Sequence, residues 1–203
     1  MNLHGGSHRA DEHREWYSRG YLPHFDHAEL VQTITFRLGD ALPAYVVEAL
    51  SERYAHSGAK GDAEKRQQIE EYLDAGHGSC ALRDERIAAV VEGALHHFDG
   101  QRYRLLAWVV MPNHVHTMIE TMAGHPLGRV IHSWKSFTGN EANRILSRTG
   151  MFWHPDFFDR FIRDADHFDQ ALAYIHQNPV AAGLVPRAED WRFSSARLWA
   201  SRR

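Results

Sequence analysis

The sequence predicts an α+β fold, in which a ferredoxin-like, split βαβ antiparallel sheet carries additional helices. Four segments rich in β-branched and aromatic residues alternate with segments whose apolar residues recur at helical spacing. With two helices set aside, the order is strand, helix, strand, strand, helix, strand, helix. The chain has 203 residues, 43% of them hydrophobic, which fits one domain with a proper core.

The first half of the chain is expected to contain one strand and three helices. Residues 1–20 are polar and rich in His and Arg, which predicts a flexible N-terminal arm ahead of a single domain over residues 21–203. The strand is predicted at residues 30–38, and the helices at residues 40–56, 62–74 and 82–98. The second and third helices would form a helical elaboration at about residues 57–98.

The second half is expected to begin with a hairpin. Its strands are predicted at residues 103–110 and 114–121, with a Pro-Asn turn between them. A helix to about residue 147 and a fourth strand at residues 157–163 follow. The last helix would be N-capped by Asp164 or Asp166 and would stop near Asn178, because Pro179 follows.

Composition is typical of a cytoplasmic protein. The first residues form no hydrophobic signal segment, no apolar run approaches a membrane span, and the lone cysteine, Cys80, excludes an internal disulfide. The formal net charge is −3, but the first hundred residues carry 10 Lys/Arg and 17 Asp/Glu, and the rest carry 13 and 9. The hairpin therefore lies in the basic half, which mildly favours a polyanionic partner.

The second strand of the hairpin carries a His-x-His pair. Because alternate residues of a strand point to the same face, His114 and His116 are expected side by side, where they could share one divalent metal ion. The chain has 16 histidines, so a chance pair is also expected. Two polar residues on a half-exposed strand are the competing interpretation.

The last helix carries a second candidate pair. Phe168, Leu172 and Ile175 have the spacing of a buried stripe, and Tyr174 and Asn178 lie four residues apart on a neighbouring face. A packing tyrosine and a C-terminal cap before the proline are the competing interpretations. His176 lies off this face and is expected to be solvated.

Two segments together resemble a known family. Residues 108–116 (Trp-Val-Val-Met-Pro-Asn-His-Val-His) and 174–185 (Tyr-Ile-His-Gln-Asn-Pro-Val-Ala-Ala-Gly-Leu-Val) are similar to the REP-associated tyrosine transposases. These are single-tyrosine HUH transposases, within the wider group of HUH endonucleases. Segments 19–25, 133–138, 158–164 and 190–195 also resemble the family, so that the resemblance covers about residues 16–198. The acidic first half and the elaboration at 57–98 depart from the family pattern, and they leave the extent of the DNA footprint open.

The resemblance implies a role for each candidate residue. His114 and His116 would be metal ligands, Tyr174 would be the nucleophile, and Asn178 would be the third ligand, one helical turn later. The implied enzyme cleaves and rejoins single-stranded, hairpin-bearing DNA through a 5′-phosphotyrosine and leaves a free 3′-hydroxyl. Two imidazoles and an amide suit Mg²⁺ or Mn²⁺. No residue stands out as the general base.

Other functions remain open at this point. A nucleic-acid-binding regulator with a degenerate site is one alternative. A metallohydrolase that uses a water nucleophile is another, and it would need carboxylate ligands, of which Glu120 is the one nearby in sequence. Related enzymes act as monomers or as dimers that exchange the tyrosine helix, so a monomer and a homodimer are both expected possibilities.

Contacts to DNA can be predicted only by residue type. Cationic side chains bind phosphates and aromatic rings stack on bases. The candidates are Lys135, Arg144, Arg160, Arg163, Trp191, Arg192 and Arg197, together with Trp153 and Phe193. Solvated surface charge or core packing is the competing interpretation for each. The expected partner is single-stranded or hairpin DNA, with the protein in the cytoplasm and on the nucleoid when bound.

Overall fold

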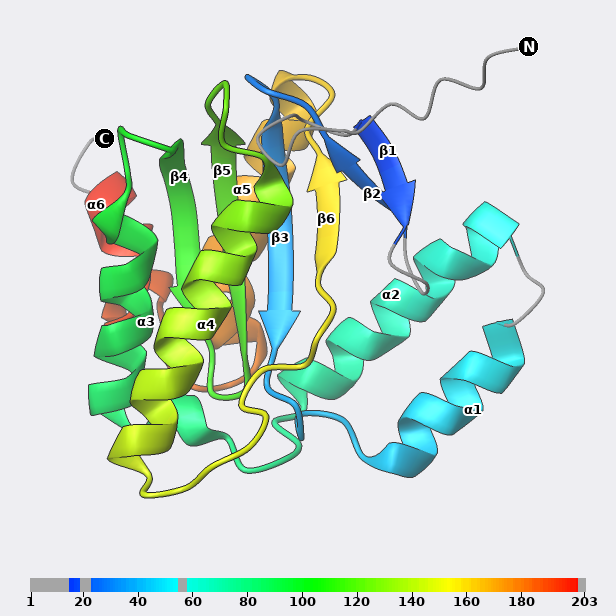
Figure 1. Ribbon diagram of the computed structural model, residues 1–203, viewed down its shortest axis with the longest axis vertical. Coiled ribbons are helices and arrows are strands. Elements are labelled where there is room, and N and C mark those ends of the chain that lie inside the picture. The colour runs from blue at the N-terminus through cyan, green and yellow to red at the C-terminus, as the bar shows by residue number, and fades with distance from the viewer. Residues whose placement is uncertain (1–14, 19–22, 55–57, 201–203) are drawn as a thin grey trace, which may run out of the picture.

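A four-stranded antiparallel sheet forms the centre of the computed structural model, which describes residues 15–18, 23–54 and 58–200 (Figure 1). The strands lie in the order β4-β5-β3-β6, and each neighbouring pair is antiparallel. Their bounds are Val31–Arg37 for β3, Tyr103–Val110 for β4, His114–Thr121 for β5 and Phe158–Phe161 for β6. Together with the helices between them, this arrangement confirms the predicted ferredoxin-like α+β fold.

Helices cover both faces of the sheet (Figure 1). α3 (Glu85–His97) and α4 (Leu127–Ile145) lie side by side on one face, and α5 (Ala165–Ala181) lies on the other. The alternation along β5 separates the two apolar clusters: Val115 belongs with Trp134 of α4, whereas Met118 belongs with Ile175 of α5. The face that carries His114 and His116 is therefore the face covered by α5.

Two further helices, α1 (Ala44–Tyr54) and α2 (Gly58–Asp74), extend beyond the β6 edge of the sheet (Figure 1). Leu50 of α1 and Leu73 of α2 are buried and join the main apolar cluster. The expected elaboration at residues 57–98 thus divides in two, because α3 covers the sheet beside α4. α3 therefore belongs to the ferredoxin-like core, and α1 and α2 are inserted between β3 and α3.

Short elements complete the described chain. β1 (Glu15–Ser18) pairs antiparallel with β2 (Pro23–Asp26), so this part of the expected N-terminal arm is a strand; the rest of the arm lies outside the described residues. The 3-10 turns η1 (Ala81–Arg83) and η2 (Ala188–Asp190) and the helix α6 (Ala196–Ala200) are the other elements. No helix of the described chain is long and apolar enough to cross a bilayer.

α5 begins where the sequence predicted and ends later. Asp164 is its N-cap, and its Oδ1 accepts a hydrogen bond from the backbone N–H of His167 at 2.8 Å. The expected stop near Asn178 is wrong, because the helix continues to Ala181 with Pro179 inside it. Pro179 removes only its own N–H, and the Ala182 N–H still donates to the carbonyl of Asn178 at 3.0 Å. Asn178 is therefore a residue within the helix and not a C-cap.

Candidate active site

The two histidines of β5 meet at one point. His114 and His116 are 0% and 3% exposed, and their Nε2 atoms lie 2.9 Å apart. The register of β3 and β5 places Arg37 opposite His114 and Thr35 opposite His116. The sequence predicted the shared face from strand alternation, and the structure shows that the two imidazoles also converge.

Each imidazole is oriented through its Nδ1 atom. The Nδ2 of Asn113 donates to the carbonyl oxygens of Leu73 and His77 at 3.1 and 3.0 Å, which leaves Asn113 Oδ1 facing His114 Nδ1 at 2.7 Å. Because this oxygen can only accept, Nδ1 of His114 carries the proton and Nε2 keeps its lone pair. Thr35 Oγ1 lies 2.8 Å from His116 Nδ1 and can accept in the same way. Both Nε2 atoms can then bind the same cation.

Burial keeps both histidines neutral. It lowers the pKa of His116 to about 3 and, together with the neighbouring His116 ring, holds the pKa of His114 well below its usual range. The neutral imidazole is the form that binds metal ions. The environment therefore favours the metal-binding state of both rings at neutral pH.

Asp74, the last residue of α2, brings a carboxylate to the histidines. One of its oxygens and one nitrogen of each ring all lie within 4.8 Å of one another, and its Oδ1 is 3.7 Å from His114 Nε2. Burial raises the pKa of Asp74 to about 6. No motif or spacing in the sequence points to this residue. The carboxylate nearby in sequence, Glu120, forms an ion pair with Arg104 instead.

Tyr174 and Asn178 reach the histidines from α5 of the same chain. The rings of Tyr174 and His116 are 5.3 Å apart between centroids at 77°, and Asn178 Nδ2 is 3.4 Å from His116 Nε2. Asn178 also donates a hydrogen bond to Asp74. Tyr174 is 41% exposed whereas Asn178 is 2% exposed, so the phenol is open to a large substrate while the polar cluster below it is buried. The structure thus brings the four predicted residues together, and their catalytic roles stay a prediction.

The donor atoms of this cluster fit a divalent cation. Among the described residues, Asp74 Oδ1 and Asn178 Oδ1 are buried oxygens with no hydrogen-bond partner. Such orphaned acceptors are uncommon in native interiors and call for an explanation. Two oxygens and two imidazole nitrogens form a mixed set that suits Mn²⁺ or Mg²⁺, and the carboxylate adds the negative charge that the predicted set lacked.

A second acidic residue of α2 contacts the phenol. Burial, then the negative charges of Glu70 and Asp74, raise the pKa of Tyr174 above its usual value, and Glu70 accepts a hydrogen bond from the phenol. Glu70 and Asp74 are four residues apart and therefore share one face of α2. That face gives the site a candidate proton acceptor, which no pattern in the sequence identifies.

Several cations proposed to bind DNA have partners within the chain. Lys135 Nζ donates to the carbonyl oxygens of Pro155 and Asp156 at 2.8 and 3.2 Å. Arg144 pairs with Glu141 at 2.7 Å. Arg192 pairs with Glu85. These contacts leave the proposed DNA-binding roles as predictions and give Lys135 a structural role at residues 155–156.

The other DNA candidates divide into exposed and buried residues. Arg160, Arg163 and Arg197 are exposed. Trp191 is half-buried and its Nε1 donates to the carbonyl of Val110 at 3.0 Å. Trp153 and Phe193 belong to the main apolar cluster, so the stacking role considered for them is wrong.

His176 also differs from the expectation that it is solvated. It is buried, and its Nε2 lies 2.8 Å from the hydroxyl of Ser195. The C-terminal segment covers this side of α5, and Ser195 in turn accepts a hydrogen bond from the backbone N–H of Trp108 in β4 at 3.0 Å. His176 therefore links the tyrosine helix to the sheet.

Comparison with known proteins bears on these residues. Residues 82–178 match the model of the family described as "Transposase IS200 like". Over this segment, which is just under half of its length, the chain is similar to the IS200-like transposases. The matched segment contains His114, His116, Tyr174 and Asn178, and it begins after Asp74.

Two individual relatives agree with this transposase family. A curated Haemophilus influenzae protein, whose name places it among REP-associated tyrosine transposases, is 26% identical over an alignment of 103 positions, and the match covers 46% of this chain and 58% of that protein. The chain thus spans little more than half of that relative. A solved REP-associated tyrosine transposase bound to a REP hairpin matches with a TM-score of 0.56 and 17% identity, over 88% of this chain and 84% of that one. This match shows the fold, and together the comparisons confirm the predicted resemblance.

Proposed function

We propose that the chain is a metal-dependent DNA strand-transferase, which cleaves and rejoins single-stranded, hairpin-bearing DNA through Tyr174. The observation that supports this most directly is the position of the half-exposed phenol beside two neutral imidazoles whose Nε2 atoms converge to 2.9 Å. A relative of the same fold is bound to a REP hairpin, which supports the choice of substrate.

The residues of the cluster have different roles in the proposed reaction. His114, His116, Asp74 and Asn178 would hold a divalent cation, which when bound would stabilise negative charge on the phosphate. The oxygen of Tyr174 forms a bond to phosphorus while the bond from phosphorus to the 3′ oxygen breaks. That oxygen leaves with the electron pair and takes up a proton, which gives a 3′-hydroxyl and a 5′-phosphotyrosine. Attack by another 3′-hydroxyl reverses these steps and rejoins the strand.

Tyr174 must lose a proton as it attacks. Glu70 accepts a hydrogen bond from the phenol and therefore lies where a general base is needed. Proton transfer to Glu70 during the attack avoids a free phenolate, which the partly desolvated and acidic surroundings disfavour. We propose Glu70 as the base of this reaction.

An adduct assay tests the proposal. A labelled single-stranded hairpin oligonucleotide is incubated with protein and Mn²⁺ or Mg²⁺, and covalent protein–DNA product is detected on a denaturing gel. We expect an adduct with the native chain, none with Tyr174→Phe, and none with His114→Ala although DNA binding persists. Glu70→Gln should slow adduct formation. The matched control is Glu71→Gln, because Glu71 is the next residue, is exposed and is hydrogen bonded to Gln67.

The same assay separates the alternatives. An adduct formed by Tyr174→Phe would contradict the nucleophile assignment. The carboxylate of Asp74 gives specific support to a second candidate, a metallohydrolase with a water nucleophile. That enzyme would cut DNA without any adduct, and cutting would survive Tyr174→Phe. DNA binding without metal-dependent cutting would instead indicate a regulator.

A further inference from the structure

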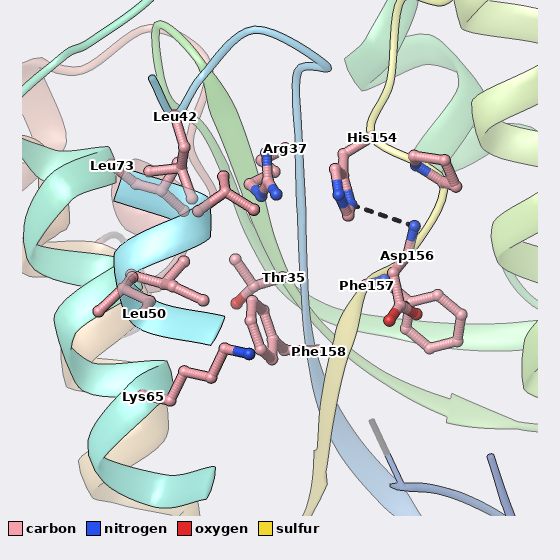
Figure 2. Close-up of a pocket in the computed structure, with 13 residues that line it drawn as sticks. Thr35, Arg37, Leu42, Leu50, Lys65, Leu73, His154, Asp156, Phe157 and Phe158 are labelled. Carbon is pink, nitrogen blue, oxygen red and sulfur yellow. Dashed lines mark hydrogen bonds between the residues drawn. The ribbon is translucent and has the colours of Figure 1, made fainter. Parts of the chain in front are cut away.

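A cavity of about 550 Å³ lies beside the candidate active site (Figure 2). Thr35 and Arg37 of β3 form its floor, α1 and α2 form one wall, and the segment from His154 to Phe158 forms the other. A volume of this size is typical of a site for a small organic ligand. No step of the proposed reaction uses this cavity.

The cavity and the histidine cluster share structural residues. Thr35 lines the cavity and contacts His116 Nδ1 at 2.8 Å. Arg37 lines it and lies opposite His114 in the β3–β5 register. Leu73 lines it and directly precedes Asp74. A DNA strand whose phosphate lay at the histidines would therefore pass close to the cavity.

The lining combines a flat ring, an apolar wall and positive charge. The β3–β6 register places half-buried Phe158 opposite Thr35, so that its ring lies on the cavity side of the sheet, and Figure 2 shows Leu50 across from it. Arg37 is 7% exposed. Its guanidinium donates a hydrogen bond to the carbonyl of Leu38 at 3.5 Å, and it also interacts with the negative charge of Asp156, which lines the same cavity. Its other N–H groups are donors that a ligand can use. Lys65 adds a second positive charge.

We propose that this cavity binds one unpaired nucleotide of the DNA strand that is cut. The base lies between Phe158 and the aliphatic wall, and Arg37 and Lys65 bind its polar edge and phosphate, as in sites that take a base out of its stack. The inference rests on the proposed function. It makes α1 and α2 part of the DNA-binding surface, so that they help to position the strand.

Binding of modified oligonucleotides tests this inference without cleavage. In a Tyr174→Phe background, each base near the cut is replaced in turn by an abasic residue, and the dissociation constant is measured by fluorescence anisotropy. We expect one position at which loss of the base weakens binding about tenfold, the size of one stacking contact. Val47 lines the cavity at 38% exposure, so Val47→Trp should fill it and weaken binding of the intact strand about tenfold. The abasic penalty at that one position should then disappear.

Tyr45 of α1 supplies the matched control. It is 68% exposed and is not among the residues that line the cavity, so Tyr45→Trp should keep both the affinity and the abasic penalty. Lys65→Gln, at a half-buried position, is the second variant should Val47→Trp fail to fold, and it should reduce the same penalty. Native affinity in the filled variant, or an abasic penalty that persists at that one position in the filled variant, would overturn the inference. If the native chain forms the adduct but filling the cavity does not remove the abasic penalty, the nucleotide site is wrong and the proposed reaction stands. If filling the cavity removes the penalty but no adduct forms, the proposed reaction is wrong and the nucleotide site stands.

Discussion

At the scale of single residues, the site depends on side chains that are not metal ligands. Asn113 and Thr35 hold the Nδ1 atoms of the two histidines at 2.7 and 2.8 Å, and they thereby direct both Nε2 atoms to the same point. Removal of such partners typically weakens metal binding about 10- to 100-fold, because the ligand loses its tautomer and its orientation. Metal affinity in this chain should therefore respond to residues outside the ligand set.

Thr35→Val tests this positioning role. The variant keeps the shape of the side chain but removes the oxygen that faces His116, so Mn²⁺ affinity measured by calorimetric titration should fall about 10- to 100-fold. Thr33→Val, two residues earlier on the same face of β3, is the control. Its hydroxyl donates to the carbonyl of Arg160, so metal affinity should stay at the native value. Equal affinities in both variants would show that Thr35 does not orient His116.

The sequence predicted some of these residues and not others. His114 with His116, and Tyr174 with Asn178, each lie within one element, where strand alternation or helical spacing fixes which side chains share a face. Asp74 and Glu70 could not be found in this way. They enter the site because α2 ends against Asn113, whose side chain binds the carbonyls of Leu73 and His77, and spacing along the chain carries no signal of that contact.

At the scale of elements, α5 is held in place at several points. Asp164 caps its start, Ile175 packs against the sheet, and His176 contacts Ser195, which is itself bound to β4. The sequence predicted the helix and its cap but placed His176 in solvent. The C-terminal segment that covers His176 is not part of this helix, so the spacing of apolar residues along the helix carries no signal of it. The position of Tyr174 therefore depends on a contact made by a neighbouring side chain.

The contact of His176 predicts a pH dependence of stability. Burial lowers the pKa of His176 from 6.5 to about 4 in the folded protein. Above the ordinary pKa of 6.5 the ring is neutral in both states. Between 6.5 and 4 only the unfolded chain binds the proton, so the free energy of unfolding falls by up to about 1.4 kcal/mol per pH unit from this residue.

Urea denaturation across that pH range measures the effect. His176→Gln keeps a hydrogen-bonding side chain but cannot titrate, so its free energy of unfolding should fall less steeply as the pH decreases. His132→Gln, on the exposed side of α4, is the control for loss of an imidazole and should follow the native curve. A native slope in His176→Gln would show that this residue contributes no proton linkage.

At the scale of the whole molecule, one chain supplies every residue of the candidate site. The sheet gives the two histidines, α2 gives Asp74 and Glu70, and α5 gives Tyr174 and Asn178. Patterns in the sequence predicted the sheet and the helices that pack on it. They did not predict where α1 and α2 dock, because that depends on how apolar side chains such as Leu50 and Leu73 join the core.

A mixing experiment tests whether the site is complete within one chain. Tyr174→Phe and His114→Ala should each form no adduct, and a mixture of the two should remain inactive, because neither chain holds both the nucleophile and a complete ligand set. The rate of adduct formation by the native chain should be proportional to protein concentration. Recovery of activity on mixing would instead mean that α5 is exchanged between two copies.

The origin of Asp74 and Glu70 has an evolutionary consequence. Both come from α2, which lies outside the ladder of backbone hydrogen bonds that joins the four strands. Mutation can therefore alter the acidic side of the site without disturbing the strand that carries the histidines. Natural selection can adjust the proton acceptor and the charge around the cation in one lineage while the histidine hairpin is inherited unchanged.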